Sequence, residues 1–252
     1  MPPRFWETIN NEYIYIKILN EMRKFFSFFI TVSLLLISQD GICQPEVVDL
    51  GLSVKWASCN LGATAPEEYG DYFAWGEVET YYVLDNVQDD SCNGWKSDKS
   101  TGYGWTSYKW SDDSGTTFTK YNTDLCYGDV DNNTVLDPED DAASVSLGGS
   151  WRMPTDAEWS ELRGRCTWRW TTRDGKEGYM VTGPNGNGIF LPAAGYQYNT
   201  RLCDTGINGE YWSSTLRTDR NGFAWGVCFD SDNILKSGYN RYIGFPIRAV
   251  TK

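Results

Sequence analysis

The chain has 252 residues, of which 22 are Lys or Arg, 34 are Asp or Glu and none is His, so its formal net charge is −12. A strongly acidic surface repels phosphate backbones, which argues against nucleic acid as a partner. The absence of His excludes Ser-His and Cys-His catalysis and His-ligated zinc. Any enzymatic activity would therefore depend on carboxylates, Tyr, Lys or Cys.

Residues 22–43 are typical of an export signal. A short basic stretch (MRK) precedes the apolar residues 25–37, and small residues follow. This pattern predicts residues 1–21 as an upstream extension and residues 22–43 as a secretory signal peptide cleaved after Cys43. Acylation of Cys43, as in a lipoprotein, and an uncleaved anchor are the alternatives. After cleavage we expect no stable membrane span, because the apolar run is short for a bilayer.

Export places the protein in the periplasm, on the outer surface or in the medium. Six cysteines remain after the predicted cleavage: Cys59, Cys92, Cys126, Cys166, Cys203 and Cys228. An oxidising compartment permits disulfides, but the spacing selects no pairing and contains no CxxC motif. Buried thiols and one or more disulfides both remain open.

In chain order, residues 47–63 predict strand, turn and strand, and residues 66–80 predict a loop followed by an aromatic strand. Residues 85–125 are rich in Asp, Ser, Gly and Thr, which predicts a long loop. The segment TDAEWSELRGRC predicts a helix near 155–166, with Thr155 as N-cap and a capping box.

After this helix, Asp174-Gly175 predicts the turn of a hairpin. The segment GIFLPAAGY (188–196) predicts a strand that runs into a loop, and four short strands are expected between residues 211 and 250. One capped helix among many short strands and long loops predicts an α+β fold. We expect a single domain over residues 46–252.

Four segments carry a resemblance to a known family. VDLGLSVKWASCNLGATAPEEYGDYFAWGE, LGGSWRMPTDAEWSELR, IFLPAAGY and YWSST stand in this order. They resemble the Fibrobacter succinogenes major paralogous domain, which is abundant in exported proteins of Bacteroidetes-type bacteria. The resemblance covers almost the whole mature chain and implies a C-type-lectin-like fold.

The segment RMPTDAEW also resembles a signature of formylglycine-generating enzymes. Those enzymes hold copper with a closely spaced cysteine pair, whereas Cys203 and Cys228 are 25 residues apart here. The resemblance therefore implies the scaffold and not the activity.

Some proteins of the C-type-lectin-like group are variable binding proteins whose last strands are diversified by retroelements. Mutation of the adenines in a template's Asn and Tyr codons can produce codons for each of the residues found at twelve positions of this chain. It cannot produce a codon for Trp225 or Lys236. The resemblance implies these twelve as ligand-binding positions: Gly222, Phe223, Gly226, Cys228, Ile234, Leu235, Ser237, Gly238, Tyr239, Tyr242, Ile243 and Phe245. A fixed domain that tolerates substitution there is the alternative.

Aromatic residues beside Gly, Ser and Asn are typical of binding loops. We expect Tyr239, Tyr242 and Phe245 to be exposed because their neighbours are turn residues. Trp212 is expected in the core. The ligand would be an unknown glycan or surface protein, and the protein a monomer.

The segment DVDNNTVLDPED has oxygen side chains at the spacing of a calcium loop. The ligands would be Asp129, Asp131, Asn133, Asp137 and Asp140. Thr134 stands where such a loop needs Gly, so a solvated acidic turn is the alternative, and its last acidic residues could instead cap a following segment. We expect no cofactor other than this calcium.

Two further functions are weighed against the binding protein. Glu67, Glu68, Asp71 and Glu77 supply carboxylates that a glycoside-acting enzyme would need. A structural or fimbrial component of the cell envelope is the other alternative. Arg152 and Arg248 are expected to be framework residues. The sequence favours an exported, non-catalytic binding protein with its ligand surface on the C-terminal strands.

Overall fold

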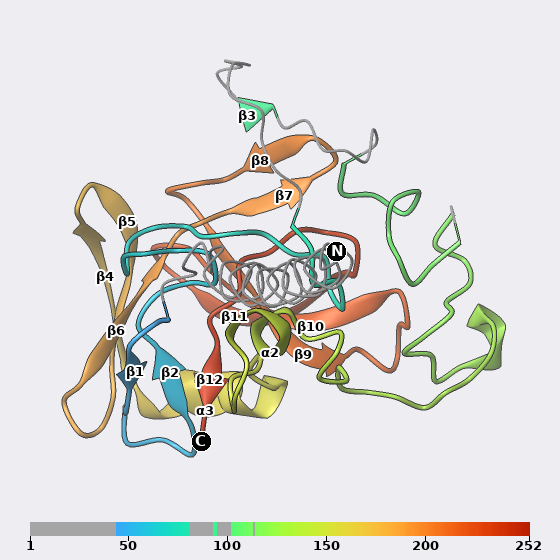
Figure 1. Ribbon diagram of the computed structural model, residues 1–252. Coiled ribbons are helices and arrows are strands. Elements are labelled where there is room, and N and C mark those ends of the chain that lie inside the picture. Colours follow the sequence, from blue (N-terminus) through green and yellow to red (C-terminus); the bar gives the residue numbers. More distant parts are fainter. Residues whose placement is uncertain (1–43, 81–92, 95–101, 113) are drawn as a thin grey trace, which may run out of the picture. The chain divides into compact units, whose positions relative to one another are not determined.

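The computed structural model describes residues 44–80, 93–94, 102–112 and 114–252 (Figure 1). The predicted extension and signal peptide lie outside these ranges, as does part of the predicted loop at 85–125. Within the described ranges, no helix has the length and apolar character that crossing a membrane requires.

The fold is a mixed α+β fold that is largely β. Its elements are β1 (Val47–Val48), β2 (Lys55–Ala57), β3 (Asn93–Gly94), the 3-10 helix η1 (Leu125–Tyr127), α2 (Ala142–Leu147), α3 (Asp156–Arg165), β4 (Thr167–Arg173), β5 (Lys176–Thr182), β6 (Gly188–Pro192), β7 (Tyr196–Tyr198), β8 (Arg201–Cys203), β9 (Gly209–Leu216), β10 (Phe223–Phe229), β11 (Ile234–Asn240) and β12 (Val250–Thr251). The described strands form antiparallel sheets of order β1-β2-β12, β11-β10-β9, β3-β8-β7 and β4-β5-β6.

The β9-β10-β11 sheet lies between two aromatic clusters. Trp212 and Ala224 on one face belong to a cluster with Phe245. On the other face, Tyr211 and Val227 join a second cluster, which includes Trp159 of α3 and the inner side chains of β5 and β6. Burying both faces makes this sheet the centre of the described fold.

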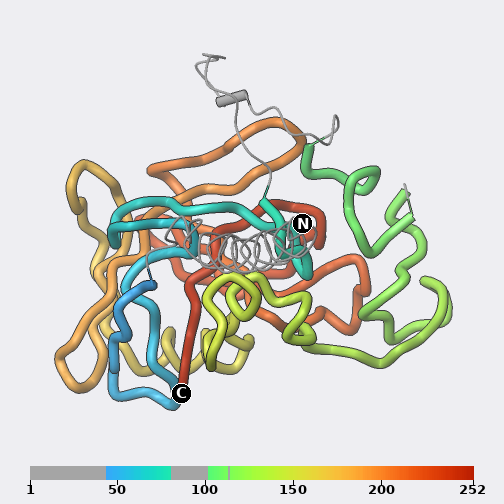
Figure 2. The backbone as a smooth tube through the Cα atoms, in the orientation of Figure 1, coloured from blue at the N-terminus to red at the C-terminus, as the bar shows by residue number. Residues whose placement is uncertain are grey.

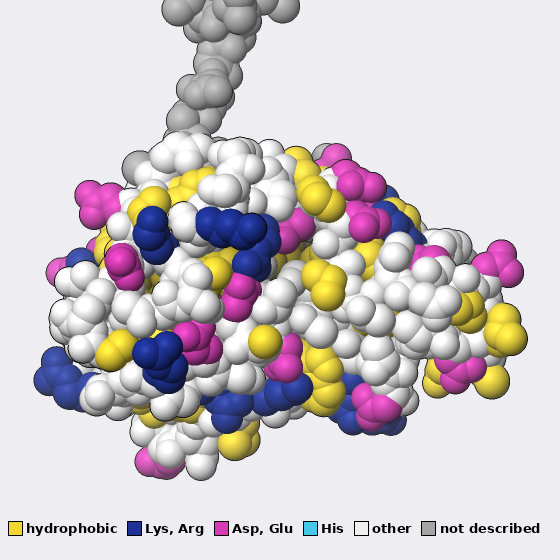
Figure 3. Space-filling model, turned by 90° about the horizontal axis from the view of Figure 1, so that it is seen from below, with side chains coloured by type: hydrophobic (Ala, Val, Ile, Leu, Met, Phe, Trp, Pro, Cys, Tyr) yellow, Lys and Arg dark blue, Asp and Glu magenta, His cyan; other side chains and the backbone are white. Residues whose placement is uncertain are grey.

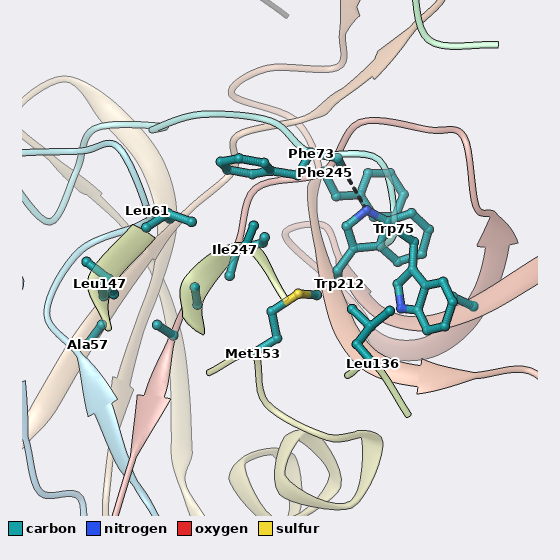
Figure 4. Packing of buried hydrophobic residues seen from close by; sticks show 14 of the residues in the cluster. Ala57, Leu61, Phe73, Trp75, Leu136, Leu147, Met153, Trp212, Phe245 and Ile247 are labelled. Atoms are coloured by element: carbon teal, nitrogen blue, oxygen red, sulfur yellow. Dashed lines mark hydrogen bonds between the residues drawn. The ribbon is translucent and has the colours of Figure 1, made fainter. Parts of the chain in front are cut away.

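Trp212 is a member of the first cluster, part of which is drawn in Figure 4. It is fully buried, as predicted, and its ring centroid lies 4.3 Å from that of Phe245. Its indole N–H donates to the carbonyl of Phe73 at 2.8 Å, which satisfies the polar atom of this large side chain.

The predicted helix is confirmed as α3. Thr155 is its N-cap and forms the predicted capping box with Glu158. α2 was not predicted as a helix, because six residues are too few for a periodic pattern. The side chain of Asp141 caps α2 by accepting from the backbone N–H of Ser144 at 3.0 Å. The acidic segment before α2 thus does provide a cap.

The predicted hairpin is confirmed as β4 and β5. Asp174 and Gly175 have φ angles of 45° and 78°, as a tight hairpin turn requires. The aromatic strand predicted within 66–80 is wrong: around Phe73 only one isolated bridge forms, with Phe245. Tyr72 and Trp75 are nevertheless buried. The aromatic pattern therefore indicated burial in the core and not pairing in a strand.

A long segment with little regular structure covers the described residues 102–112 and 114–135 (Figure 2). Arg241, which is fully buried, holds it to the central sheet. Its guanidinium donates to the carbonyls of Lys120 at 3.0 Å and Asn221 at 3.1 Å and to the Tyr108 hydroxyl at 2.9 Å. The loop packs, therefore, through a buried cation that bonds to backbone carbonyls.

Arg248 is a framework residue, as predicted. It is fully buried and donates to the carbonyls of Ser58 at 2.7 Å and Phe190 at 2.8 Å, and to the side chain of Asn60 at 2.9 Å. Arg152 forms the other expected framework contact, an ion pair with Glu158 of the capping box.

Replacing Arg248 tests this framework. We expect Arg248→Met to lower the free energy of unfolding by about 3 kcal/mol, because buried carbonyls lose their donors. The matched control is Arg169→Met, since Arg169 is an exposed residue of β4. Urea denaturation of both variants measures the difference. Equal stabilities would contradict the assigned role.

Candidate binding site

The twelve positions implied as ligand-binding lie on β10, β11 and the chain around them, and nine of them are at least partly exposed. Three are buried: Gly226, Tyr242 and Phe245. The exposure expected of Tyr242 and Phe245 is therefore wrong. The neighbouring turn directs both rings inward, with Phe245 against Trp212 and Tyr242 at 4.7 Å from Trp105.

The register of the sheet divides the accessible positions between two faces. Cys228 is opposite Leu235 and Gly226 opposite Ser237, and Tyr239 follows on the same face. Ile234 lies on the other face, where it packs on the second cluster. The face that carries Cys228 therefore has four of the implied binding residues at partly or fully exposed positions, namely Cys228, Leu235, Ser237 and Tyr239.

A pocket of about 230 Å³ opens at the hairpin end of this face. Its lining comes from all three strands and the turns beside them: Asn208, Glu210, Cys228, Phe229, Asp230, Asn233, Leu235 and Tyr239. Three of these belong to the twelve implied positions, namely Cys228, Leu235 and Tyr239. The pocket thus joins polar, acidic and apolar groups at the end of the central sheet.

Glu210 is the most unusual group in the pocket. It stands opposite Cys228 in the sheet register and is only 6% exposed. Its Oε2 atom has no hydrogen-bond partner among the residues that the structure describes. Burial, together with the charge of Asp204, raises the pKa of Glu210 to about 8, so the carboxyl is mainly protonated at neutral pH.

Cys228 and Tyr239 also line the pocket. Burial raises the pKa of the thiol and of the hydroxyl, and each group lies near enough to influence the other electrostatically. The Tyr239 ring also packs against Phe245 at 4.8 Å between centroids, which fixes its position. A thiol with a raised pKa is a poor nucleophile, so this part of the pocket is suited to contact and not to attack.

Asp230 brings a second carboxylate to the mouth. It accepts from the backbone N–H groups of Asp232 at 2.8 Å and Asn233 at 2.7 Å, at the turn between β10 and β11. These bonds hold the pKa of Asp230 below its usual value, so its negative charge persists.

Sequence reasoning missed Glu210. It lies within NGEYWSST, where the neighbouring residues form the framework of β9, and this strand is buried on both faces. Polar and apolar residues do not alternate in such a strand, so the sequence does not indicate on which face of the sheet each side chain lies. The only signal was an acidic residue inside a strand that otherwise fits the core.

The five predicted calcium ligands do not all come together. Among the described residues, the acidic side chains close enough to share an ion are Asp137, Glu139 and Asp140, so only two of the five are included. Asp131 accepts instead from the backbone N–H groups of Tyr121 at 2.7 Å and Asn122 at 2.9 Å. It serves the loop as a turn-forming side chain.

Lys120 lies among the three close carboxylates. Its Nζ atom is 2.7 Å from Asp137 and 2.6 Å from Asp140, and the Asp140 side chain is only 2% exposed. An ammonium already pairs with two of these carboxylates, which is the arrangement of a structural ion pair. Calcium binding at this loop stays a prediction that has to compete with Lys120.

Three of the four carboxylates weighed for glycoside hydrolysis have structural partners. Glu68 accepts from Thr64 at 2.7 Å, Glu77 from the backbone of Lys109 at 2.7 Å, and Glu67 lies 3.2 Å from Arg173. Burial raises the pKa of Asp71. These contacts are those of framework residues.

The cysteines and the surface add little to the site. Cys126, Cys166 and Cys228 are thiols, and Cys92 lies outside the described residues. On the face in Figure 3, Lys and Arg side chains are interspersed with Asp and Glu, and hydrophobic side chains form small separate groups. That view offers no broad apolar surface to a partner.

Comparison with known proteins gave no match to this chain among family models, curated proteins or solved structures.

The buried carboxyl makes stability depend on pH. Its pKa is raised on folding from the ordinary 4.5 to about 8, so Glu210 destabilises the native state as pH rises through this window. Glu210→Gln removes the ionisation. We expect the difference in free energy of unfolding between the variant and the natural protein to grow by about 3 kcal/mol, in favour of the variant, as pH rises from 5 to 8.

Urea denaturation at pH 5, 6.5 and 8 measures this gain. Glu79→Gln is the control, because Glu79 is exposed. A difference between Glu210→Gln and the natural protein that stays constant over this range would contradict the buried, mainly neutral state of Glu210.

Proposed function

We propose that this chain is an exported, non-catalytic binding protein that holds its ligand on the face of β10 and β11 that carries Cys228, Leu235 and Tyr239. The observation that carries the proposal is the pocket at the hairpin end of the central sheet, where Cys228, Leu235 and Tyr239 meet Glu210. Leu235 is 55% exposed, a large apolar side chain available to a ligand.

The pocket chemistry favours binding over catalysis. A raised pKa makes the thiol of Cys228 a weak nucleophile. Glu67, Glu68 and Glu77, three of the four carboxylates that a glycoside-acting enzyme would use, have structural partners in the framework. We retain the glycoside-acting enzyme and the fimbrial component as alternatives, the first predicting product formation and the second self-association.

The resemblance to the Fibrobacter succinogenes major paralogous domain extends this proposal to a C-type-lectin-like fold. The largely β architecture with one long capped helix agrees with that family. The ligand would be a glycan or a surface protein, and the protein a monomer at the periplasm, outer surface or medium. Diversification of the last strands by a retroelement would fit partly exposed positions on a paired sheet.

A paired substitution tests the binding face. The purified protein is screened against arrays of glycans and of bacterial surface proteins, and each hit is measured again with Leu235→Asp. We expect at least tenfold weaker binding, about 1.4 kcal/mol, because a charge replaces an apolar contact. Val145→Asp is the control, since Val145 on α2 is a similarly exposed aliphatic residue (52%).

We expect the control to change affinity less than twofold. Equal losses in both variants would place the ligand elsewhere. Release of a product from a bound glycan would replace the binding protein by the enzyme, and a concentration-dependent polymer would favour the fimbrial component.

Sequencing the coding DNA of residues 208–252 in many close isolates tests diversification. We expect variation at the accessible positions of the twelve, with Trp212, Trp225 and Arg248 unchanged. Gly226, Tyr242 and Phe245 should vary less because they are buried. Substitutions spread evenly over the whole domain would contradict diversification and leave a fixed binding domain.

A further inference from the structure

The pocket beside Glu210 has acidic groups and an apolar wall but no basic side chain in its lining. Glu210 and Asp230 both line it, and the charge of Asp204 acts on Glu210 from the chain before β9. An anionic ligand would add a further negative charge to this set. Electrostatic complementarity therefore favours a cation.

The buried carboxyl is also incompletely bonded. Glu210 is 94% buried by its 6% exposure, yet its Oε2 atom accepts no hydrogen bond. A buried acceptor without a donor destabilises a fold, so a ligand that supplies a donor removes that penalty. An ammonium supplies three donors and a charge.

The rest of the pocket suits an alkyl chain that carries such a group. Leu235, Phe229 and the Tyr239 ring provide apolar wall, and Asn208 and Asn233 provide amide oxygens. The volume of about 230 Å³ is below the roughly 300–1,000 Å³ of pockets for drug-sized ligands. The space fits one side-chain-sized group.

A metal ion fits the pocket less well. The acidic groups of the described residues that lie close enough to share an ion are at Asp137, Glu139 and Asp140. Glu210 is not one of them, so a metal here would lack the several oxygen ligands that hard cations need.

We propose that this pocket binds a primary alkylammonium group, with Glu210 as its buried counter-ion and Leu235 and Tyr239 along its alkyl chain. The proposal rests on the proposed function, since it names the ligand chemistry of the same binding face. The ammonium could belong to a small free amine or to a lysine side chain of a protein.

Binding of the cation would release a proton. Mainly neutral at pH 7, the Glu210 carboxyl must ionise to pair with the ammonium, whereas an alkylammonium keeps its own proton until about pH 10. Several titratable or charged groups face this part of the fold: Asp204, Tyr72, Tyr211, Cys228, Asp230, Tyr239 and, from α3, Arg163, which acts on Cys228. Below pH 8 the carboxyl of Glu210 is mainly protonated, so it is the group from which a bound cation would displace a proton.

Calorimetry and NMR titration with n-butylammonium test the proposal on the natural chain. We expect binding with a dissociation constant in the millimolar range, with affinity rising about tenfold from pH 6 to pH 7 as linkage to one proton requires. Butanol and butyrate, which match the alkyl chain without the cation, should bind at least tenfold more weakly. The binding enthalpy should depend on the buffer, since a proton is released.

Two variants and a control locate the effect. Glu210→Gln keeps the shape and loses the charge, so we expect at least a tenfold loss of affinity. Leu235→Lys places the chain's own ammonium at the mouth of the pocket, at an exposed position that does not burden folding, and should block the probe. Glu79→Gln should bind like the natural chain, because Glu79 is exposed and is not a lining residue.

Nα-acetyl-lysine N-methylamide distinguishes the source of the ammonium. Binding of this probe as well as n-butylammonium would indicate a protein lysine, and binding of n-butylammonium alone a small free amine. Equal binding of n-butylammonium and butanol, or unchanged affinity in Glu210→Gln and Leu235→Lys, would overturn the proposal. If that happened while Leu235→Asp still weakened an array hit, the binding protein would stand with another ligand class.

Discussion

Burial of two arginine side chains is the constraint on which this fold depends. The protein has short strands and long irregular segments, so many buried carbonyls lack a partner in a sheet. Arg248 supplies donors to the segment after β2 and to β6, and Arg241 supplies them to the loop around Lys120. Each guanidinium thereby replaces the backbone ladder that a more regular protein would use.

These two arginines flank the turn that supports one lining residue of the pocket. Between them the chain passes through the turn that directs Tyr242 and Phe245 inward, and Phe245 in turn fixes Tyr239. The wall of the pocket is thus an extension of the first aromatic cluster. The opposite side is set by β9, where the register brings Glu210 beside Cys228. A rigid core therefore determines the geometry of a small open site.

The features that the sequence could predict are local ones. Thr155 and Glu158 define the helix start, and Asp174-Gly175 defines a turn, because each depends on residues a few positions apart. The core position of Trp212 was expected because it lies in a motif shared with the resembled family. These elements required no knowledge of distant contacts.

The features that escaped prediction depend on long-range packing. The exposure of Phe245 is decided by Trp212 and that of Tyr242 by Trp105, both far away in the chain. The acidic spacing of residues 129–140 resembles a calcium loop, but Lys120 reaches it from outside the segment. Glu210 was hidden for the same reason, since a strand buried on both faces gives no alternation from which a pocket could be inferred.

β11 ends the central sheet, and this position has a consequence for how the protein tolerates change. Its pairing with β10 uses backbone atoms, while Leu235, Lys236 and Ser237 have side chains at least partly exposed. Lys236 also forms an ion pair with Asp156 at 2.7 Å, a charge of the kind that discourages an edge strand from adding a foreign strand. A set of variants with substitutions at Leu235 and Ser237 would change ligand recognition. The backbone pairing of β11 and the charge of Lys236 would be kept, so the scaffold and its solubility would not depend on the substituted residues.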